Sequence, residues 1–308
     1  MKWERKDLIG LEDVSPEEIW HILEVAKGFK KKLVEKDVKK IATFENKNFV
    51  TLFYQASTRT RFSFEIAAKN LGLNVMNFSS ATTSVSKGES LYDTVKTLEA
   101  MGVDIFAIRH GMSGSARYIA EHTPAHVLNA GDGVHEHPTQ SLLDMFTIWE
   151  SKGKLDGVKV VLVGDHDHNR SSRSNTWALS KMGAEVVLCG PRTLVSDEYT
   201  DLGGRFVGDV EEALKEADVI YTFRIQQERQ EPGLVPSLGE YSRFYGINEE
   251  RLRFAKPDVV VLHPAPMIRG SEITSAVADG SHSLVFEMVT NGVAVRMALI
   301  YLLLGGES

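Results

Sequence analysis

The sequence predicts an α/β fold built on parallel sheets, and two observations carry that prediction. Short β-branched runs recur along the chain, and each is followed by a stretch that has the pattern of a helix. Near-continuous apolar strands that alternate with helices indicate parallel sheets covered on both faces. A chain of 308 residues, 43% of them hydrophobic, can bury a large core, and its length favours about two domains. The expected strands are FVTLFY (49–54), NVMNF (74–78), DIFAIR (104–109), HVLNAG (126–131), VKVVLVGD (158–165), EVVLCG (185–190), DVIYTF (218–223) and DVVVLHP (258–264).

The clearest sign of a domain boundary lies in the segment 131–157. A glycine-containing turn there leads into a helix with Leu142, Leu143, Phe146 and Trp149 along one side. The helix ends at a glycine, and a new series of strands then begins. We therefore expect the chain to change domain where this helix starts.

The closing segment EMVTNGVAVRMALIYLLLG (287–305) is predicted to be a buried helix. No strand follows it, and so apolar a helix must pack on other elements, either in the second domain or back in the first. Its run VAVRMALIYLLLG is shorter than the ~18 residues needed to cross a bilayer and carries Arg296. The N-terminal MKWERKDLIG is charged and has no signal-peptide core. We expect no membrane-spanning segment.

The charge balance limits the classes of partner. A formal charge of −7 and a sequence pI near 5.8 argue against general binding of nucleic acid or of a membrane surface, because these anionic partners attract proteins with an excess of Lys and Arg. Any anion site must then be a local concentration of positive charge. The one cysteine, Cys189, permits no intrachain disulfide, so a reducing compartment, the cytoplasm, is expected. Cys189 ends an apolar run, which favours a buried small hydrophobe over a nucleophile.

The stretch YQASTRTRFSFE (54–65) places Arg59 and Arg61 among hydroxyls where a strand stops and a helix starts. Ser57 or Thr58 can cap that helix. A helix N-terminus after a polar turn aims backbone N–H groups and the positive end of the helix dipole at an anion. The planar fork of Arg59 suits phosphate oxygens. A capped helix with solvated arginines fits this segment alone equally well.

A second hydroxyl-rich loop, ATTSVSKGESLYDT (81–94), holds Lys87 and Gly88 just before a helix. Such a loop can let the ammonium group reach over a bound anion, or it can be only flexible. The GxxxxGK spacing of a P-loop is absent, so an ATP site gains no support. The turn VVLVGDHDHNRSSRSN lacks GxGxxG, so dinucleotide binding is supported only weakly.

Further cationic and amide side chains follow the strands of both halves. Strand ends and helix starts on one side of a parallel sheet converge where ligands bind in open α/β folds. Clustered like charges repel and are costly to bury unpaired, so these groups imply a multiply anionic ligand. They are Arg109 and His110 after a strand, His135, His137 and Gln140 in HEHPTQ, Arg170 and Arg173 in HNRSSRSN, and Arg224 and Gln226 in RIQQERQ, together with the rigid turn HPAP (263–266).

The HxH pairs at 135 and 137 and at 166 and 168 invite a metal interpretation. Neither pair brings a third ligand at i, i+4 spacing, and neither has the cysteine partners common in zinc sites. Surface or hydrogen-bonding histidines are the favoured interpretation. We expect no metal and no cofactor.

The motifs of the chain resemble, in order, those of aspartate carbamoyltransferase catalytic chains. STRTR with HPTQ is typical of transcarbamoylases as a group, and the Lys-Gly-Glu loop with R-x-Q-x-ER is typical of the aspartate enzyme. The resemblance runs from about residue 5 to 304. It rests on STRTRFSFE, SVSKGES, Arg-His after a strand, LNAGDG with HPTQSLLDMFTI, the GD…NRSSRSN turn, R-x-Q-x-ER and HPAP.

Ornithine carbamoyltransferase is similar through the STRTR and HPxQ region. It typically carries a cysteine in an HCLP turn and an SMG loop for its cationic substrate. Here the turn is His263-Pro264-Ala265-Pro266, and SMG is absent. Lys87, Arg170 and Arg224 would also suit a dicarboxylate and repel the ammonium group of ornithine.

The resemblance implies a role for each matching residue. The phosphate of carbamoyl phosphate would be held by Ser57, Thr58, Arg59 and Thr60. Its carbamoyl group would be surrounded by Arg109, His137 and Gln140 and by backbone carbonyls near Ala265 and Pro266. The carboxylates of aspartate would be held by Arg170, Arg224 and Gln226. A neighbouring subunit's site would be reached by Lys87 and by Ser84 or Ser86.

The resemblance also implies two doubly wound parallel-sheet domains joined by interdomain helices. A carbamoyl-phosphate-binding domain would comprise 1–134 and 289–308, and an aspartate-binding domain 135–288. The family forms homotrimers with shared active sites, in a closed cyclic arrangement. A regulatory chain or a dihydroorotase partner stays open.

The resulting hypothesis is a transferase of de novo pyrimidine biosynthesis. It would move the carbamoyl group of carbamoyl phosphate to the α-amine of L-aspartate, giving N-carbamoyl-L-aspartate and phosphate. The catalytic residues would be Arg59, Thr60, Lys87, Arg109 and His137, which would stabilise charge on the carbonyl oxygen and on phosphate. Two alternatives stay open: a transferase acting on ornithine or another amino acid, and a non-catalytic anion-binding protein on the same fold.

Overall fold

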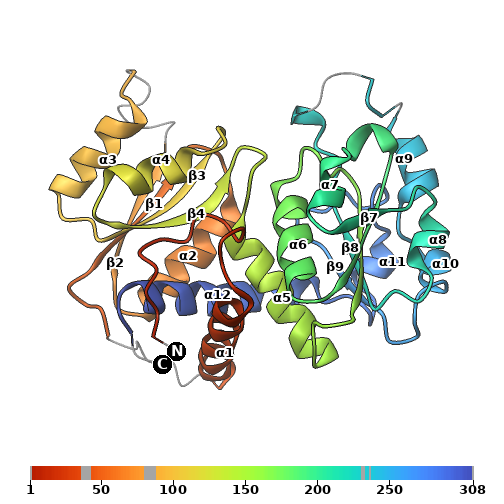
Figure 1. The fold of residues 1–308 in the computed structure, drawn as a ribbon, viewed down its shortest axis with the longest axis horizontal. Helices are drawn as coiled ribbons and strands as arrows, with labels where there is room; N and C mark the ends of the chain where they lie inside the picture. Colours follow the sequence, from red (N-terminus) through yellow and green to blue (C-terminus); the bar gives the residue numbers. More distant parts are fainter. Residues whose placement is uncertain (1, 36–42, 80–87, 230–232, 236, 307–308) are drawn as a thin grey trace. The chain divides into compact units, whose positions relative to one another are not determined.

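The computed structural model describes residues 2–35, 43–79, 88–229, 233–235 and 237–306. The chain falls into two compact units: unit 1 is Met1–Leu143 with Val289–Ser308, and unit 2 is Asp144–Met288. Each unit holds one sheet whose paired strands are all parallel (Figure 1). The predicted fold class, α/β with two parallel sheets, is confirmed.

Unit 1 is built on a four-stranded sheet of order β2-β1-β3-β4. Its elements are α1 (Pro16–Val34), β1 (Asn48–Phe53), α2 (Thr58–Asn70), β2 (Asn74–Ser79), α3 (Leu91–Ala100), β3 (Ile105–His110), α4 (Ser115–His122) and β4 (His126–Asp132). Successive side chains of a strand point to opposite faces, and both faces of β1 are buried. Val50 packs in a cluster with Val95 of α3 and Ile119 of α4. Phe49 stacks on Phe64 of α2 with ring centroids 6.0 Å apart.

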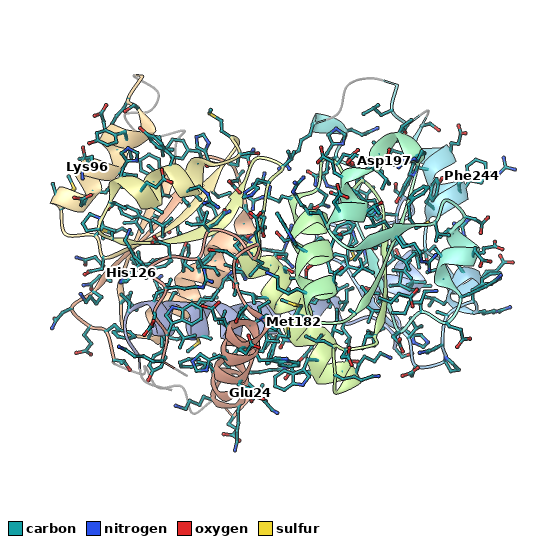
Figure 2. The ribbon with its side chains drawn as sticks, in the orientation of Figure 1. Glu24, Lys96, His126, Met182, Asp197 and Phe244 are labelled. Atoms are coloured by element: carbon teal, nitrogen blue, oxygen red, sulfur yellow. The ribbon has the colours of Figure 1, made fainter. Side chains whose placement is uncertain are left out.

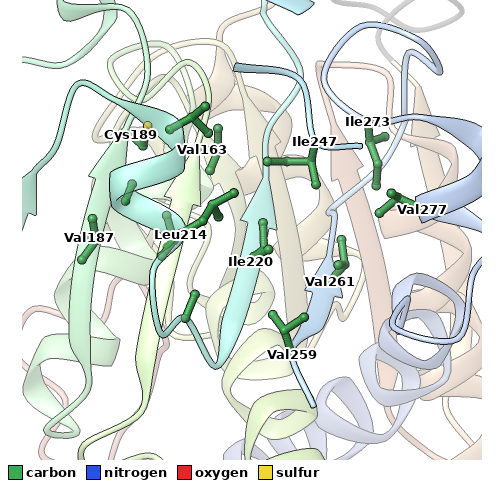
Figure 3. Packing of buried hydrophobic residues seen from close by; sticks show 14 of the residues in the cluster. Val163, Val187, Cys189, Leu214, Ile220, Ile247, Val259, Val261, Ile273 and Val277 are labelled. Carbon is green, nitrogen blue, oxygen red and sulfur yellow. The ribbon is translucent and has the colours of Figure 1, made fainter. Parts of the chain in front are cut away.

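Unit 2 is built on a five-stranded sheet of order β7-β6-β5-β8-β9. Its strands and helices are β5 (Lys159–Val163), α6 (Arg170–Lys181), β6 (Glu185–Cys189), α7 (Glu198–Asp201), β7 (Gly204–Phe206), α8 (Val210–Leu214), β8 (Val219–Thr222), α9 (Leu238–Tyr245), α10 (Glu249–Leu252), β9 (Val260–Leu262) and α11 (Ser275–Ala278). Val163, Ile220 and Val261 of neighbouring strands pack with Leu214 of α8 and Val277 of α11 (Figure 3). This cluster closes one face of the sheet.

The eight expected strands coincide with β1 to β6, β8 and β9 to within a few residues. Strand β7 (Gly204–Phe206) was not predicted from the sequence. Its three residues are too short to show a pattern, and the strand exists because it pairs with β6 at the edge of the sheet.

Both boundaries between the units fall inside helices, α5 (Pro138–Lys152) and α12 (Val285–Leu303). Unit 1 therefore continues to Leu143, beyond the expected domain end at 134. The contacts of α5 show why. Arg296 of α12 reaches Thr139 in its first turn, at 3.5 Å from Nη2 to Oγ1. Asp144, the next residue after Leu143, bonds within unit 2, since Tyr221 Oη donates to its carboxylate at 2.8 Å.

Helix α12 (Val285–Leu303) has the length expected for the closing helix and starts two residues earlier. Over the described residues it is the one helix long and apolar enough to cross a membrane by length and composition, with a mean hydropathy of 1.4. However, 67% of that window is buried inside the protein. The helix packs in unit 1 from Val289 on, where Tyr301 contacts the ring of Phe29 edge-on at 5.5 Å. A core helix accounts for its composition.

Several charged side chains lie on the outer faces of helices. Glu24 on α1 and Lys96 on α3 are two that Figure 2 labels in unit 1. Lys96 pairs with Glu99 one turn later, at 2.9 Å from Nζ to Oε2. Such partly exposed i, i+3 pairs contribute only a few tenths of a kcal/mol, so apolar burial dominates stability.

The core cluster of unit 2 yields a stability prediction. Ile220 is fully buried between strands and helices, so Ile220→Ala should lower the free energy of unfolding by about 2–5 kcal/mol. The control is Val34→Ala, because Val34 is 63% exposed at the end of α1 and should change stability by less than about 0.5 kcal/mol. Guanidinium unfolding followed by tryptophan fluorescence measures both. An unchanged midpoint for Ile220→Ala would show that this cluster does not stabilise unit 2.

Candidate active site

Helix α2 begins at the polar turn that follows β1. Ser57 is its N-cap residue, with extended backbone angles (φ −160°, ψ 98°), and its side chain makes no capping hydrogen bond. Ser57 therefore occupies the expected N-cap position, but its side chain does not form the expected capping hydrogen bond. The first turn of α2 also has no acidic residue, whereas Ser15 closes a full capping box on α1. The first N–H groups of α2 are thus left for an external acceptor, as an anion site requires.

The two arginines of this turn differ in their surroundings. Arg61 Nε lies 3.5 Å from Oε1 of Glu65 one turn later, and its guanidinium lies 5.4 Å from the ring centroid of Phe62. Arg59 is exposed and, within the described part of the chain, has no carboxylate partner. Thr60 beside it is buried. Arg59 rather than Arg61 is thus the guanidinium that an incoming anion would meet.

Arg109 ends strand β3, directly beside the end of β1. The register pairs Phe53 with Arg109, and the backbone N–H of Tyr54 donates to the Arg109 carbonyl at 2.8 Å. The side chain is held as well, because Nη1 donates to the carbonyl of Ala130 on β4 at 2.9 Å. The guanidinium therefore lies across the carboxyl ends of β3 and β4, at the same sheet edge as the start of α2.

His137 and Gln140 come to this edge through the turn between β4 and α5. Gly133 has a φ of +49°, and a Cβ there would collide with Ser113, so the turn requires glycine. The N–H of Gly133 donates to the His110 carbonyl at 3.0 Å. His137 and Gln140 are 4% and 9% exposed at the start of α5. Unit 1 thereby brings the predicted residues of three strand ends together.

A buried carboxylate, Asp132, holds this turn. It accepts from the N–H of Gly114 at 2.7 Å, from Nδ2 of Asn129 at 2.8 Å and from the N–H of Glu136 at 3.2 Å. Burial alone would raise the pKa of Asp132, but hydrogen bonds from His135 and Asn129 and the other donors lower it below its ordinary value. The carboxylate stays ionised and fixes the backbone that leads to His137.

In unit 2, Arg170 and Arg224 lie at the carboxyl edge of the sheet. Arg170 is the first residue of α6, directly after the β5 turn, and is 3% exposed. Arg224 and Gln226 follow β8, which pairs with β5 through Val163 and Thr222. Two adjacent strand ends thus carry the three residues predicted to hold carboxylates.

Asp165, fully buried, links these two loops of unit 2. Oδ2 accepts from the N–H of Gln226 at 3.2 Å, and Oδ1 lies 2.8 Å from Nδ1 of His168. Arg229 Nη1 in turn donates to the His168 carbonyl at 3.2 Å. Gly164 permits the approach, because a Cβ there would lie 2.7 Å from the carbonyl oxygen of Phe223. The position of Gln226 therefore depends on Asp165.

The HPAP turn follows β9, next to β8. Nδ1 of His263 accepts from the N–H of Ala265 at 2.8 Å, and Nε2 donates to Oε1 of Glu272 at 3.0 Å. The same carboxylate oxygen accepts from the N–H of Ile268 at 2.7 Å. The turn contains a cis bond between Ala265 and Pro266. A buried histidine–carboxylate pair thus fixes the backbone of Ala265 and Pro266.

Several predicted residues stand apart from these groups. Ser84, Ser86 and Lys87 lie outside the described residues. Arg173 lies 5.7 Å from the ring of Trp177 and 3.5 Å from Glu198. The ring of His135 is 3.3 Å from Asp132. These contacts explain the positions of Arg173 and His135, and no ligand is needed to explain them.

The histidines of the second HxH pair and the cysteine are structural in character. Buried His166 bonds Ser172 Oγ at 2.6 Å and the Cys189 carbonyl at 3.1 Å, and burial lowers its pKa. Burial raises the pKa of Cys189 to about 12, so its thiolate is scarce at neutral pH. In the described segments no three His, Cys, Asp or Glu side chains gather as a metal site would need.

Sequence reasoning missed the residues that support the candidate site. Thr139 lies inside the HPTQ motif and Asp165 directly follows a strand, so the position of each in the sequence could have indicated a place near the site. No sequence pattern pointed to Glu272 or Arg296. The partners of Arg296 are distant in sequence, and those of Glu272 are set by the geometry of the turn.

Comparison with known proteins places the chain in a family. The model of the aspartate/ornithine carbamoyltransferase carbamoyl-P binding domain matches residues 6–150, and that of the Asp/Orn binding domain matches residues 156–303. The chain belongs to the aspartate/ornithine carbamoyltransferase family.

Similar proteins of the family cover the chain from end to end. The aspartate carbamoyltransferase catalytic subunit of Moorella thermoacetica is 55% identical, covering 100% of both chains. That of Desulforamulus reducens is 54% identical, covering 100% of this chain and 98% of the relative.

Solved structures of two family members share the fold. Ornithine carbamoyltransferase from Pyrococcus furiosus superposes with a TM-score of 0.87 at 33% identity, covering 100% of both chains. Aspartate transcarbamoylase from Trypanosoma cruzi in complex with N-(phosphonacetyl)-L-aspartic acid gives 0.87 at 27% identity, covering 97% of this chain and 95% of the other.

Proposed function

We propose that the chain transfers the carbamoyl group of carbamoyl phosphate to the α-amine of L-aspartate, giving N-carbamoyl-L-aspartate and phosphate. One observation carries the proposal: relatives 54% and 55% identical over essentially the whole length are aspartate carbamoyltransferase catalytic subunits. The groups at the strand ends of each unit agree in charge with such substrates.

In this proposal unit 1 binds carbamoyl phosphate. The open N-terminus of α2, with Ser57, Thr58 and Thr60, and the guanidinium of Arg59 hold the phosphate oxygens. Arg109, His137 and Gln140 surround the carbamoyl group. The uncapped Ser57 and the bond from Arg109 to Ala130 support these roles. The carbonyls near Ala265 and Pro266 receive the carbamoyl NH₂.

Unit 2 binds aspartate in this proposal. Arg170 and Arg224 hold the two carboxylates, and Gln226, positioned by Asp165, adds an amide donor. Two guanidinium groups at adjacent strand ends suit a dicarboxylate and oppose the ammonium group of ornithine.

The chemistry needs no side-chain nucleophile. The deprotonated amine of aspartate attacks the carbonyl carbon of carbamoyl phosphate, and a tetrahedral intermediate forms. Its collapse breaks the bond to phosphate, which leaves with the electron pair and takes up the proton that the amine loses. Negative charge grows first on the carbonyl oxygen, where Arg109, Thr60 and His137 stabilise it, and then on phosphate, where Arg59 and Lys87 do. Orientation of the two substrates provides much of the remaining rate.

Substrate choice within the family needs a direct test, because the ornithine and aspartate enzymes fit the fold with the same TM-score of 0.87. Purified protein given carbamoyl phosphate and L-aspartate should form carbamoyl-aspartate, detected colorimetrically, whereas ornithine in parallel should give no citrulline above background. Citrulline as the main product would make the chain an ornithine enzyme. Binding of carbamoyl phosphate without either product would favour the non-catalytic alternative.

Arg59 and Arg61 provide a matched pair for testing the phosphate site. Arg59→Ala should lower kcat about a hundredfold, because losing a charge-stabilising donor costs on the order of 3 kcal/mol of barrier. Arg61→Ala should leave kcat within about threefold, since Arg61 pairs with Glu65 on its own helix. Steady-state kinetics at saturating substrates measures both. Equal losses in the two variants would remove the special role of Arg59.

We further propose a homotrimer with shared active sites, to which Lys87 and Ser84 or Ser86 of one chain contribute in the next, and a cytoplasmic location. A regulatory chain or a dihydroorotase remains a candidate partner. Light scattering on the purified protein should give about three times the chain mass of 34.2 kDa. A monomer with full activity would exclude sharing of the sites between chains.

A further inference from the structure

Arg296 is a buried cation for which the proposed chemistry has no use. It lies in α12 and is 3% exposed. Nη1 donates to Ser63 Oγ at 2.8 Å and to the Gly292 carbonyl at 3.3 Å, and the guanidinium lies 4.9 Å from the ring centroid of Phe64. Burying a guanidinium is costly, so its retention in an apolar helix calls for a reason.

The partners of Arg296 belong to the two elements that carry the carbamoyl phosphate residues of unit 1. Ser63 lies in α2, in the turn after Arg59 and Thr60. Thr139 lies in the first turn of α5, between His137 and Gln140, and its Oγ1 is 3.5 Å from Nη2 of Arg296. One side chain of the last helix thus bonds to both elements.

The bond to Thr139 determines where protons can lie. A guanidinium has donors only, so the Thr139 hydroxyl must accept from Arg296. The hydroxyl keeps one proton to donate, and Oγ1 lies 3.5 Å from Nδ1 of His137. Thr139 is fully buried, and no third partner for its hydroxyl is found in the part of the chain that the structure describes. If His137 carried a proton on Nδ1, the Thr139 proton would face two donors and have no acceptor.

We propose that Thr139 and Arg296 are positioning residues that hold His137 in the neutral tautomer with its proton on Nε2. The proposal rests on the role proposed for His137. In this tautomer Nε2 is a donor, which suits a carbonyl oxygen that gains negative charge during the reaction. The opposite tautomer would present an acceptor lone pair from Nε2 to that oxygen.

A purely structural role is the competing interpretation, in which Arg296 only ties α12 to α2 and α5. That interpretation predicts that losing the Thr139 hydroxyl lowers stability and leaves the histidine tautomer unchanged. Stability and tautomer must therefore be measured on the same variants.

The decisive variants are Thr139→Val and Thr139→Ser. Valine has nearly the shape of threonine without the hydroxyl, and serine keeps the hydroxyl. Solid-state ¹⁵N NMR of the substrate-free protein labelled with ¹⁵N-histidine reports which ring nitrogen carries the proton. The His137 signals are assigned by their absence from His137→Asn. Because no turnover is needed, a failure of the proposed function leaves this result readable.

The wild type and Thr139→Ser should show His137 protonated on Nε2, and Thr139→Val should show a new population protonated on Nδ1. In the carbamoyl-aspartate assay, Thr139→Val should lose about 10- to 100-fold in kcat with a smaller change in KM for carbamoyl phosphate. Thr139→Ser should keep most of the activity. A wild-type His137 protonated on Nδ1, or an unchanged tautomer in folded Thr139→Val, overturns the proposal.

Arg296→Lys and Arg296→Met extend the test to the cation. Lysine keeps a donor for Thr139 and should preserve the Nε2 proton of His137. Methionine has no donor, so Arg296→Met should show a population of His137 protonated on Nδ1, as Thr139→Val should. If methionine in the core prevents folding, the Thr139 pair alone decides. An unchanged tautomer in folded Arg296→Met would limit the positioning role to Thr139 and overturn the part given to Arg296.

Discussion

Parallel pairing of the strands is the constraint on which the candidate site depends. In a parallel sheet the carboxyl ends of all strands lie at one edge, so whatever follows each strand is collected there. In unit 1 the register sets Arg109 beside Phe53, and the chain after Phe53 turns at once into the open start of α2. In unit 2 the pairing of β5 with β8 sets Arg170 and Arg224 on adjacent loops. Each sheet thus brings to its own carboxyl edge cationic side chains that are far apart in the sequence.

Buried carboxylates make this gathering stable. Asp132, Asp165 and Glu272 each accept hydrogen bonds from backbone N–H groups of the loops at a sheet edge. A carboxylate held by backbone donors fixes the loop that provides them.

The fold itself does not choose the second substrate. An ornithine enzyme and an aspartate enzyme both superpose on this chain with a TM-score of 0.87. In the proposed function, specificity lies in the side chains at the edge of the second sheet, where Arg170, Arg224 and Gln226 would favour carboxylates. In the proposal made above, Thr139 and Arg296 would affect the reaction indirectly, through the orientation and protonation of His137.

The sequence by itself determined the elements and the class of ligand. Apolar runs fixed eight strands to within a few residues, because a buried parallel strand must be apolar on both faces. The hydroxyls around Arg59 and the cations after several strands together indicated an anion site, because clustered like charges are costly to bury unless an anion binds among them. Motif order then indicated the family.

Only the tertiary structure decided which of those groups have partners. Arg59 and Arg61 look alike in sequence, yet Arg61 pairs with Glu65 because the two are one helical turn apart on a formed helix. Strand β7 exists through its pairing with β6, and α5 changes units after Leu143 because its first turn bonds to Arg296. The bonds of Arg296 join residues separated by 233 and 157 positions. Local periodicity carries no information about such distances, since only the folded core brings the last helix against the second turn of α2 and the first turn of α5.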